Sequence, residues 1–390
     1  MNVFTPVSSL VSPSSRFDVT LASIVGVLLA AGAVMVFSAS VGVQNLLGME
    51  AQAPMQMFWR IGKHFFSICV GLLVLVACSS VDIGVWRRLS RLLFPLGILL
   101  LALLLVPGLG HEVNGSTRWF DIGPIGIQPS EIVKVLVILH LADYFVRSSA
   151  GIQSFVVGVV RPAVPLGAIS ALLVLEPDLG SAAVVLFIAL GMMFLSGVRL
   201  HHLGGILVTV FAVLAALIYM SDYRLQRFLC FQDPWADPTG CGYQLVQALI
   251  AVGSGEWLGV GLGSSVQKLF YLPHANNDFL VAVIAEELGL LGIAVLVVLY
   301  GALLWRIFQI AHRALARGDF FGTRVAQGVG LLLTMQMMVH LGVNFGVVPT
   351  KGLTMPLMSA GGSSMVASCF AIGLLFSIDR SNRRPRPVSK

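Results

Sequence analysis

Acidic residues that follow polar, glycine-rich stretches are the first candidates for chemistry in this chain. Asp278 ends the longest stretch without membrane-like composition, residues 221–278, and stands directly before a long apolar run. A carboxylate in such a place can act as a general base and take the proton of a hydroxyl nucleophile. It can equally cap the following helix, which stabilises a helix by about 0.5–2 kcal/mol. The residues alone leave both roles of Asp278 open.

Ionisable residues inside apolar segments form a second group, because a charge in hydrocarbon is costly and usually serves a function. Glu131 and Lys134 are three residues apart and share one face of a helix that starts near Pro129. They either pair with each other or bind the substrate, with Lys134 on a phosphate. Arg161 lies in another apolar run and requires a buried acid or a polar cavity.

Arg118, Lys268 and Lys351 are candidate ligands for an anionic substrate group. They lie in three polar segments beside apolar runs, at residues 111–131, 221–278 and 349–364. A departing diphosphate needs positive charge of this kind. Contact with solvent or lipid headgroups is the alternative for each cation. The glycines of GVGLGSS, residues 259–265, fit a phosphate cradle or a tight turn.

Composition indicates the elements that position these residues. Hydrophobic residues make up 57% and charged residues 11% of the 390 residues, whereas a soluble domain carries about 25% charged residues. A membrane span needs about 20 apolar residues. The sequence therefore predicts an all-α polytopic membrane protein with a large extracytoplasmic loop between spans 7 and 8. Its ten spans are expected at residues 19–41, 61–78, 92–107, 129–146, 155–175, 182–196, 204–220, 279–305, 325–348 and 355–378.

The basic residues predict how these spans are oriented. With the N-terminus inside, roughly twice as many Lys and Arg residues fall in inner segments as in outer ones, as the positive-inside rule requires. We expect a cytoplasmic segment 1–18, a membrane domain 19–379 with the outward loop 221–278, and a basic cytoplasmic tail 380–390. The tail fits an orientation signal that contacts membrane lipid, with partner binding as the alternative. Basic and aromatic residues are not interleaved, so nucleic-acid binding is not expected.

The cysteines and acids bear on redox state and metal binding. Cys230 and Cys241 both lie in the outward loop, where an oxidising compartment allows a disulfide, while free thiols are the other option. No Cys and His residues have zinc-site spacing, so no metal site is predicted. A divalent cation, Mg²⁺ or Mn²⁺, is still compatible with one or two carboxylates and substrate phosphates.

Five segments together resemble the SEDS family (shape, elongation, division and sporulation) of bacterial membrane glycosyltransferases. The resemblance covers nearly the whole chain, from about Phe17 to Asp379. In order, the segments read NGSTRWFDIGPIGIQPSE, EPDLGS, GYQLVQALIAVGSGEWLGVGLGSSVQKLFYLPHANNDF, VAVIAEELGLLG and PTKGLTMPLMSAGGSS. The tracts SVQKLFYLP and PTKGLTMP are similar to the division branch of that family. The family's essential outer aspartate falls on Asp278. Relatives tend to have Pro-Glu-x-His-Thr-Asp there, whereas this chain has Pro-His-Ala-Asn-Asn-Asp from Pro273 to Asp278.

The resemblance implies an activity, a place and partners. The activity is polymerisation of lipid II, an undecaprenyl-diphosphate-linked disaccharide-pentapeptide, into glycan strands. The place is the outer face of the bacterial inner membrane at the division septum. The partners are a class B penicillin-binding transpeptidase (FtsI-like) and FtsQ-, FtsL-, FtsB- and FtsN-like division proteins.

Two other functions use the same features. A transporter that flips lipid II would use the intramembrane charges Glu131, Lys134 and Arg161 but would not need an outer aspartate. A non-catalytic scaffold that recruits the transpeptidase through its spans would not need Asp278 either. Purified protein given lipid II separates a polymerase from both alternatives.

Overall fold

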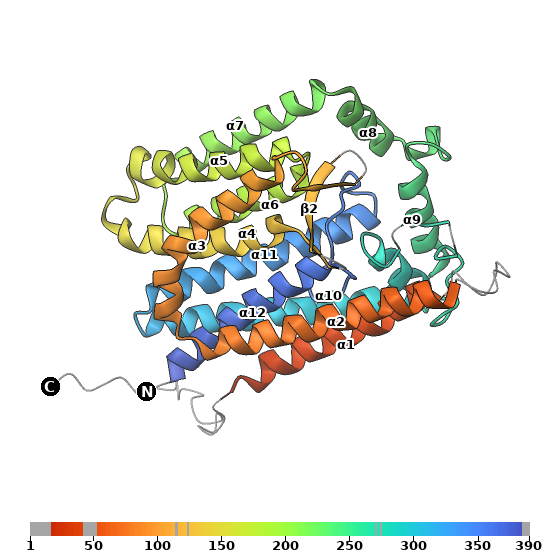
Figure 1. Ribbon diagram of the computed structural model, residues 1–390, viewed down its shortest axis with the longest axis horizontal. Coiled ribbons are helices and arrows are strands. Elements are labelled where there is room, and N and C mark those ends of the chain that lie inside the picture. Colours follow the sequence, from red (N-terminus) through yellow and green to blue (C-terminus); the bar gives the residue numbers. More distant parts are fainter. Residues whose placement is uncertain are drawn as a thin grey trace, which may run out of the picture.

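Long helices run side by side along the longest axis of the molecule (Figure 1). The computed structural model describes residues 17–41, 53–113, 116–122, 125–269, 271–273 and 275–383. Each of the ten predicted spans coincides with one long helix. These helices are α1 (Val19–Val41), α2 (Ala53–Ser80), α3 (Ile83–Leu104), α4 (Pro129–Arg147), α5 (Arg161–Leu175, after the π-helical turn η2, Val156–Val160), α6 (Leu179–Leu195), α7 (Leu200–Tyr219), α10 (Leu280–Ala316), α11 (Phe320–Asn344) and α12 (Gly362–Arg383).

Seven of the described helices are long and apolar enough to cross a membrane: α1, α2, α5 with its π-helical turn, α7, α10, α11 and α12. The other three predicted spans fall on α3 and α4, which carry several charged residues, and on α6, which has 17 residues. The structure thus confirms a polytopic helical membrane protein. The predicted N-terminal segment up to residue 16 and the tail from residue 384 lie outside the described residues.

Three predicted spans start seven or more residues away from their predicted positions, and the one predicted from residue 61 begins at Ala53. The helix predicted from residue 92 already begins at Ile83, because Arg87 and Arg91 in its first turns bind Asp143 of α4 instead of ending the helix. The helix predicted from residue 355 begins at Gly362. Pro356 lies in a turn before it, where Met358 N and Ser359 N both bond to the carbonyl of Met355.

The connections hold shorter elements. Strands β1 (His111–Val113), β2 (Ser116–Ile122) and β3 (Ile125–Ile127) form an antiparallel sheet in the order β1-β2-β3. The sequence predicted only a constrained connection there, so the sheet is a departure from the all-helical prediction. The long loop contains α8 (Asp222–Gln232), the 3₁₀ turn η3 (Pro234–Ala236) and α9 (Tyr243–Ser254), and the turn η1 (Ser149–Gly151) follows α4.

The two ends of the bundle differ in chemistry. One end, which we call the arginine end, gathers buried aspartates on arginines: Asp143 on Arg87, Arg91 and Arg147, Asp18 on Arg306, and Asp379 on Arg383 and Arg313. Phe17 and Phe376 stack there with ring centroids 4.7 Å apart, so the first and last described residues share this end. The opposite end, the loop end, carries α8, α9 and the sheet (Figure 1).

The centre of the bundle is α12. In its apolar window 89% of the residues are buried, whereas no residue of α7 is buried. Around α12 lie α2, α4, α10 and α11, and α7 contacts the rest of the bundle through α6. The helices nearest the centre therefore also bring their ends together at the loop end.

A break inside α10 is closed by the glycine-rich loop. Gly289 has φ +66° and ψ −164°, which interrupts the helix. The loop supplies the replacement hydrogen bonds: Val260 N donates to Glu286 O and Leu290 N donates to Glu256 O, both at 2.9 Å. Irregular backbone at membrane depth persists only where protein satisfies it in this way. The GVGLGSS segment is therefore a turn packed on α10, which is the tight turn that the sequence allowed as an alternative to a phosphate cradle.

We expect Gly289→Ala to destabilise the protein. A positive φ costs a non-glycine residue about 1–3 kcal/mol, and a Cβ here would lie 2.4 Å from Gly259 N. The thermal midpoint in detergent should fall by several degrees. Gly301→Ala in the same helix is the control, since a Cβ at Gly301 meets nothing within 4 Å. Equal midpoints for the two variants would contradict the role of the break.

Candidate functional site

A polar cavity of about 430 Å³ opens at the loop end. Its walls are α2, strand β2, the first turns of α4 and α12, and the chain segments 276–278 and 352–361. Three of the five segments that the resemblance singled out, the first, third and fifth, thus meet at one chamber. Its polar side chains include Arg60, Lys63, His64, Ser67, Arg118, Gln128, Glu131, Asn276, Asn277, Asp278, Thr354 and Ser364.

Asp278 is half-buried and lines this cavity. The N-cap position of α10 is the next residue, Phe279, which makes no side-chain cap bond. Asn344, the last residue of α11, supplies a side-chain hydrogen bond to the first turn of α10, because its Oδ1 accepts from Ala282 N at 2.9 Å. The Nδ2 atom of Asn344 donates to Asp278 O at 3.1 Å. The last residue of α11 therefore fixes the backbone that carries the carboxylate.

Two further contacts hold the chain around Asp278. Ser359 Oγ donates to the carbonyl of Asn277 at 2.8 Å, and Ala360 N donates to that of Asn276 at 3.1 Å. Gly352 faces the carboxylate so closely that a Cβ there would lie 3.3 Å from Asp278 Oδ2. The segment before α12 therefore forms the wall against which Asp278 rests.

The cavity gathers cations from two distant parts of the chain. Arg118 on β2 donates from Nε to Glu176 O at 3.3 Å and also to Pro177 O, so the EPDLGS segment orients its guanidinium. Arg60 and Lys63 line the cavity from α2. Together with His64 they are spaced i, i+3 and i+4 and share one helix face. Sequence reasoning missed these three residues, although their spacing at the start of an apolar helix was a usable signal.

His64 is a buried polar group whose hydrogen-bonding capacity is not used inside the described protein. Its exposed fraction is 4%, and neither ring nitrogen has a hydrogen-bond partner there. Buried polar atoms without partners are rare, and each one calls for an explanation such as a ligand or water. Because His64 lines the cavity, a ligand in the cavity can supply the missing partner.

Glu131 and Lys134 form the pair that one sequence interpretation expected. Lys134 Nζ lies 2.7 Å from Glu131 Oε1, and the lysine is fully buried. Glu131 lines the cavity, while Lys134 stands behind it and does not. Gln336 Nε2 approaches the other carboxylate oxygen at 3.5 Å. Arg161, by contrast, is exposed, so the prediction that it requires a buried acid or a polar cavity was wrong.

The structure does not bring Lys268 to the cavity. Its Nζ lies 2.6 Å from Glu287 Oε1 and 3.1 Å from Ser38 Oγ, and the side chain is buried. The neighbouring Glu286 accepts from Val266 N at 2.9 Å. Lys351 precedes Gly352 in the wall, but it is not among the lining residues. Arg118, Glu131 and Asp278 are the predicted site residues that meet at one place.

Two helix N-termini also face the cavity. Gln128 and Glu131 stand at the start of α4, and Gly362 and Ser364 at the start of α12. The positive ends of helix dipoles and their first N–H groups attract anions. Among the described residues no group of three or more His, Cys, Asp and Glu side chains gathers at one point. The carboxylates of Asp278 and Glu131 thus line the same cavity as three cationic side chains and two helix N-termini.

Glu176, whose backbone carbonyl accepts from Arg118, has a side-chain carboxyl with a raised pKa. Glu176 is buried, and its Oε1 has no hydrogen-bond partner among the described residues. Burial, together with the charge of Asp178, raises the pKa of Glu176 to about 8, and Arg118 opposes this rise. Around neutral pH the side chain is therefore mostly protonated, which limits the cost of burying it.

Fold and site define a polytopic membrane protein with a polar cavity at one end. The chain belongs to the FtsW/RodA/SpoVE family of cell cycle proteins, whose family model matches residues 19–384. It is 44% identical to the probable peptidoglycan glycosyltransferase FtsW of Thioalkalivibrio sulfidiphilus, over 96% of this chain and 92% of the relative. It is 45% identical to the protein of the same name from Nitrosococcus halophilus, over 92% and 91%.

Solved structures share the fold. A chain in a peptidoglycan synthase complex that coordinates polymerisation and crosslinking matches with a TM-score of 0.74 and 30% identity, over 94% of this chain and 98% of that one. The rod shape determining protein RodA of Thermus thermophilus matches with a TM-score of 0.67 and 29% identity, over 95% and 98%. The match covers nearly the full length of each chain.

We expect Lys134→Met to destabilise the protein strongly. It leaves Glu131 as an unpaired charge, and breaking a buried pair from one side costs about 3–5 kcal/mol. The double variant Glu131→Gln with Lys134→Met should recover most of the loss, because no charge then remains. Thermal midpoints in detergent measure both effects. A single variant as stable as the parent chain would contradict this account of the pair.

Glu176→Gln should change how stability depends on pH. Because the folded state holds the pKa of Glu176 near 8, above the ordinary 4.5, the stability from its proton is complete below about pH 4.5 and is lost as pH rises toward 8. The glutamine variant lacks this loss. Its thermal midpoint relative to the parent should therefore rise between pH 5 and 8. Glu256→Gln, at an exposed position, is the control and should show no such trend.

Proposed function

We propose that this chain is a peptidoglycan glycosyltransferase that polymerises lipid II, with Asp278 as the general base. The observation that carries the proposal is the cavity, which the half-buried carboxylate of Asp278 lines together with Arg60, Lys63 and Arg118. The relatives named above, at 44–45% identity, carry the name of this activity. A carboxylate opposite an anion site is what transfer from a sugar diphosphate requires.

In this mechanism a sugar hydroxyl of one substrate attacks the anomeric carbon of the other. Asp278 takes the hydroxyl proton as the new C–O bond forms and the bond from the anomeric carbon to the diphosphate oxygen breaks. Negative charge then grows on the diphosphate. Arg118, Arg60 and Lys63 stabilise that charge, together with the N-termini of α4 and α12. Glu131 and His64 offer hydrogen bonds to the sugars, and Lys351 is a further candidate ligand of the diphosphate.

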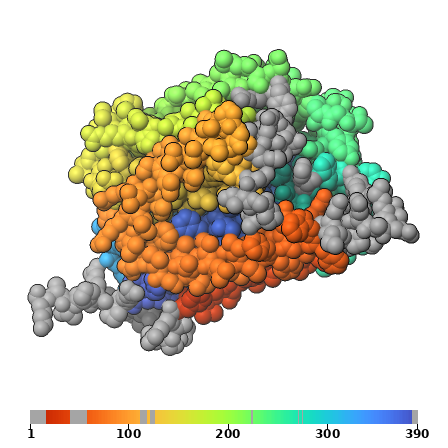
Figure 2. All heavy atoms as spheres, viewed as in Figure 1, coloured from red at the N-terminus to blue at the C-terminus, as the bar shows by residue number. Residues whose placement is uncertain are grey.

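The polyprenyl chain of the substrate needs an apolar channel open to lipid. Figure 2 shows a furrow between α2 and α3 with α12 at its floor. Because α2 also supplies Arg60, Lys63 and His64 to the cavity, a lipid lying along it keeps its diphosphate close to these residues. This arrangement supports a substrate that remains in the membrane while its head group reacts.

The orientation and the partners are part of the proposal. Basic residues concentrate on the cytoplasmic side of membrane proteins, so the arginine end and both termini are placed inside, and the cavity faces the oxidising outer compartment. Assembly at the septum with a class B penicillin-binding transpeptidase (FtsI-like) and with FtsQ-, FtsL-, FtsB- and FtsN-like proteins is proposed on the family. The structural likeness to a chain of a peptidoglycan synthase complex supports the transpeptidase.

We expect Asp278→Asn to abolish polymerisation and leave a folded, membrane-inserted protein. An amide cannot take up the proton, and loss of a general base costs about 10²–10⁴-fold in rate. The purified variant, supplied with its transpeptidase partner and lipid II, is assayed for glycan chains with Mg²⁺ and with EDTA. The EDTA arm tests for a divalent cation on the diphosphate. Asp233→Asn, at an exposed position in the same loop, should retain activity.

The same experiment separates the alternatives. A flippase or a scaffold would give no glycan chains from purified parent protein in detergent, where no second compartment exists. A scaffold would also make Asp278→Asn harmless in cells. Near-normal glycan synthesis by the purified Asp278→Asn variant would refute Asp278 as the base, and absence of chains from the parent protein with its partner would refute the proposed activity.

A further inference from the structure

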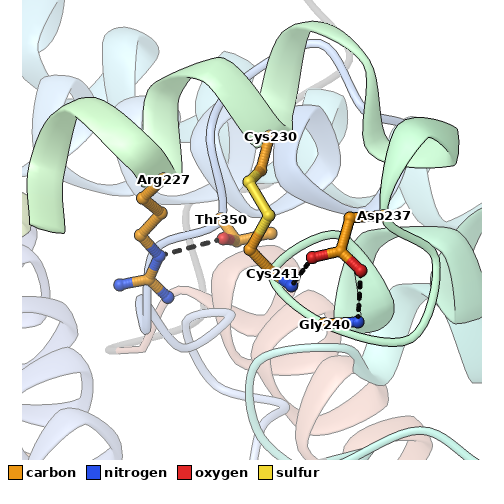
Figure 3. Close-up of a disulfide and its surroundings, with 6 residues drawn as sticks. All are labelled: Arg227, Cys230, Asp237, Gly240, Cys241 and Thr350. Carbon is orange, nitrogen blue, oxygen red and sulfur yellow. Dashed lines mark hydrogen bonds between the residues drawn. A yellow bond between two sulfur atoms is a disulfide. The ribbon is translucent and has the colours of Figure 1, made fainter.

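A disulfide closes the loop between α8 and α9 (Figure 3). Cys230 in α8 is bonded to Cys241, which lies two residues before α9 begins at Tyr243. Asp237 shapes the intervening turn, because its two carboxylate oxygens accept from Gly240 N and Cys241 N, each at 3.0 Å. The disulfide allowed by the sequence is thus present, and we call residues 222–241 with this bond the strap.

The disulfide joins a weakly anchored helix to a firmly anchored one. The described contacts of α8 are chiefly with α7, no residue of which is buried, and with the turn η3. By contrast, α9 buries Leu245, Val246, Ala248 and Ala251 and packs on α10 and α11. The covalent bond therefore supplies a connection between α8 and the bundle that packing alone does not provide.

The same side of α8 reaches the wall of the cavity. Arg227 is three residues before Cys230 and so shares its helix face. Its Nε donates to Thr350 Oγ1 at 3.3 Å, as Figure 3 shows. Thr350 stands two residues before Gly352, which faces the Asp278 carboxylate, and four before Thr354, which lines the cavity.

The wall segment depends on side chains for its position. Residues 349–355 belong to no helix or strand. Besides Arg227, His340 of α11 holds the segment, with its Nδ1 at 2.8 Å from Leu353 O. A segment of this kind is positioned as accurately as its few contacts allow, and small displacements at a reacting group are expensive in rate.

We propose that Arg227 is a positioning residue for Asp278 and that the Cys230–Cys241 disulfide makes this positioning dependent on oxidation. With the bond closed, the strap holds Arg227 on Thr350, and the 349–355 segment keeps Gly352 against the carboxylate. A dithiol such as dithiothreitol transfers two electrons to the bond: the S–S bond breaks, two thiols form, and the reductant becomes a cyclic disulfide. The inference rests on the proposed polymerase activity and on the outward placement of the loop.

The test uses the purified full-length chain with its transpeptidase partner, lipid II as substrate, and dithiothreitol as the probe. Reduction of the parent protein should lower kcat by about threefold to tenfold with little change in KM, since a misplaced base slows reaction more than binding. Arg227→Ala should show the same loss without reductant, and Arg227→Lys, which keeps a donor, should recover part of it. Cys69→Ser, at an exposed free thiol of α2, is the control and should respond to reductant like the parent.

Two further variants test the coupling itself. The double variant Cys230→Ser with Cys241→Ser should be slow in both conditions, and reductant should not slow it further. Arg227→Ala should likewise be insensitive to reductant, because both changes break one connection. If reduction left the kcat of the parent unchanged, or lowered the kcat of Arg227→Ala as much as that of the parent, the proposed role of the strap would be wrong. An active Asp278→Asn variant would instead show that Asp278 is not the base, and the effects of reduction and of Arg227→Ala on kcat could still be compared.

Discussion

Every polar group placed inside this bundle has to find its partner in the protein, because lipid offers none. That constraint organises the structure. Lys268 and Glu287 pair with each other and with Ser38 of α1, so the long loop, α10 and α1 are joined at one point. The carboxylate of Glu286, one residue earlier, receives the amide of Val266. A charged residue of the loop thus serves to close the loop onto the membrane helices.

The cavity at the loop end is lined by some polar side chains that have no hydrogen-bond partner in the described protein. At the arginine end each buried aspartate is matched by arginines. At the loop end His64 and Ser364 keep polar atoms without partners in the described protein, and both line the cavity. A polar substrate can therefore satisfy groups that the fold leaves unmatched.

Precision at Asp278 comes from elements far away in the chain. Asn344 of α11 caps α10 and holds the Asp278 carbonyl, while Ser359 holds Asn277. The Asp278 side chain lines the cavity on a backbone that α11 and the segment before α12 hold in place.

The ten apolar helices, the family and the candidate residues Arg118, Glu131 and Asp278 could be predicted from the sequence, because apolar length and local motifs depend on contiguous residues. The packing of the helices was needed to show that these three residues meet at one cavity, that Arg60, Lys63 and His64 join them, and that Lys268 pairs with Glu287 instead. The small sheet that carries Arg118 was also found only in the structure. These outcomes depend on partners tens to hundreds of residues apart, and such pairings follow from how helices pack and not from local spacing.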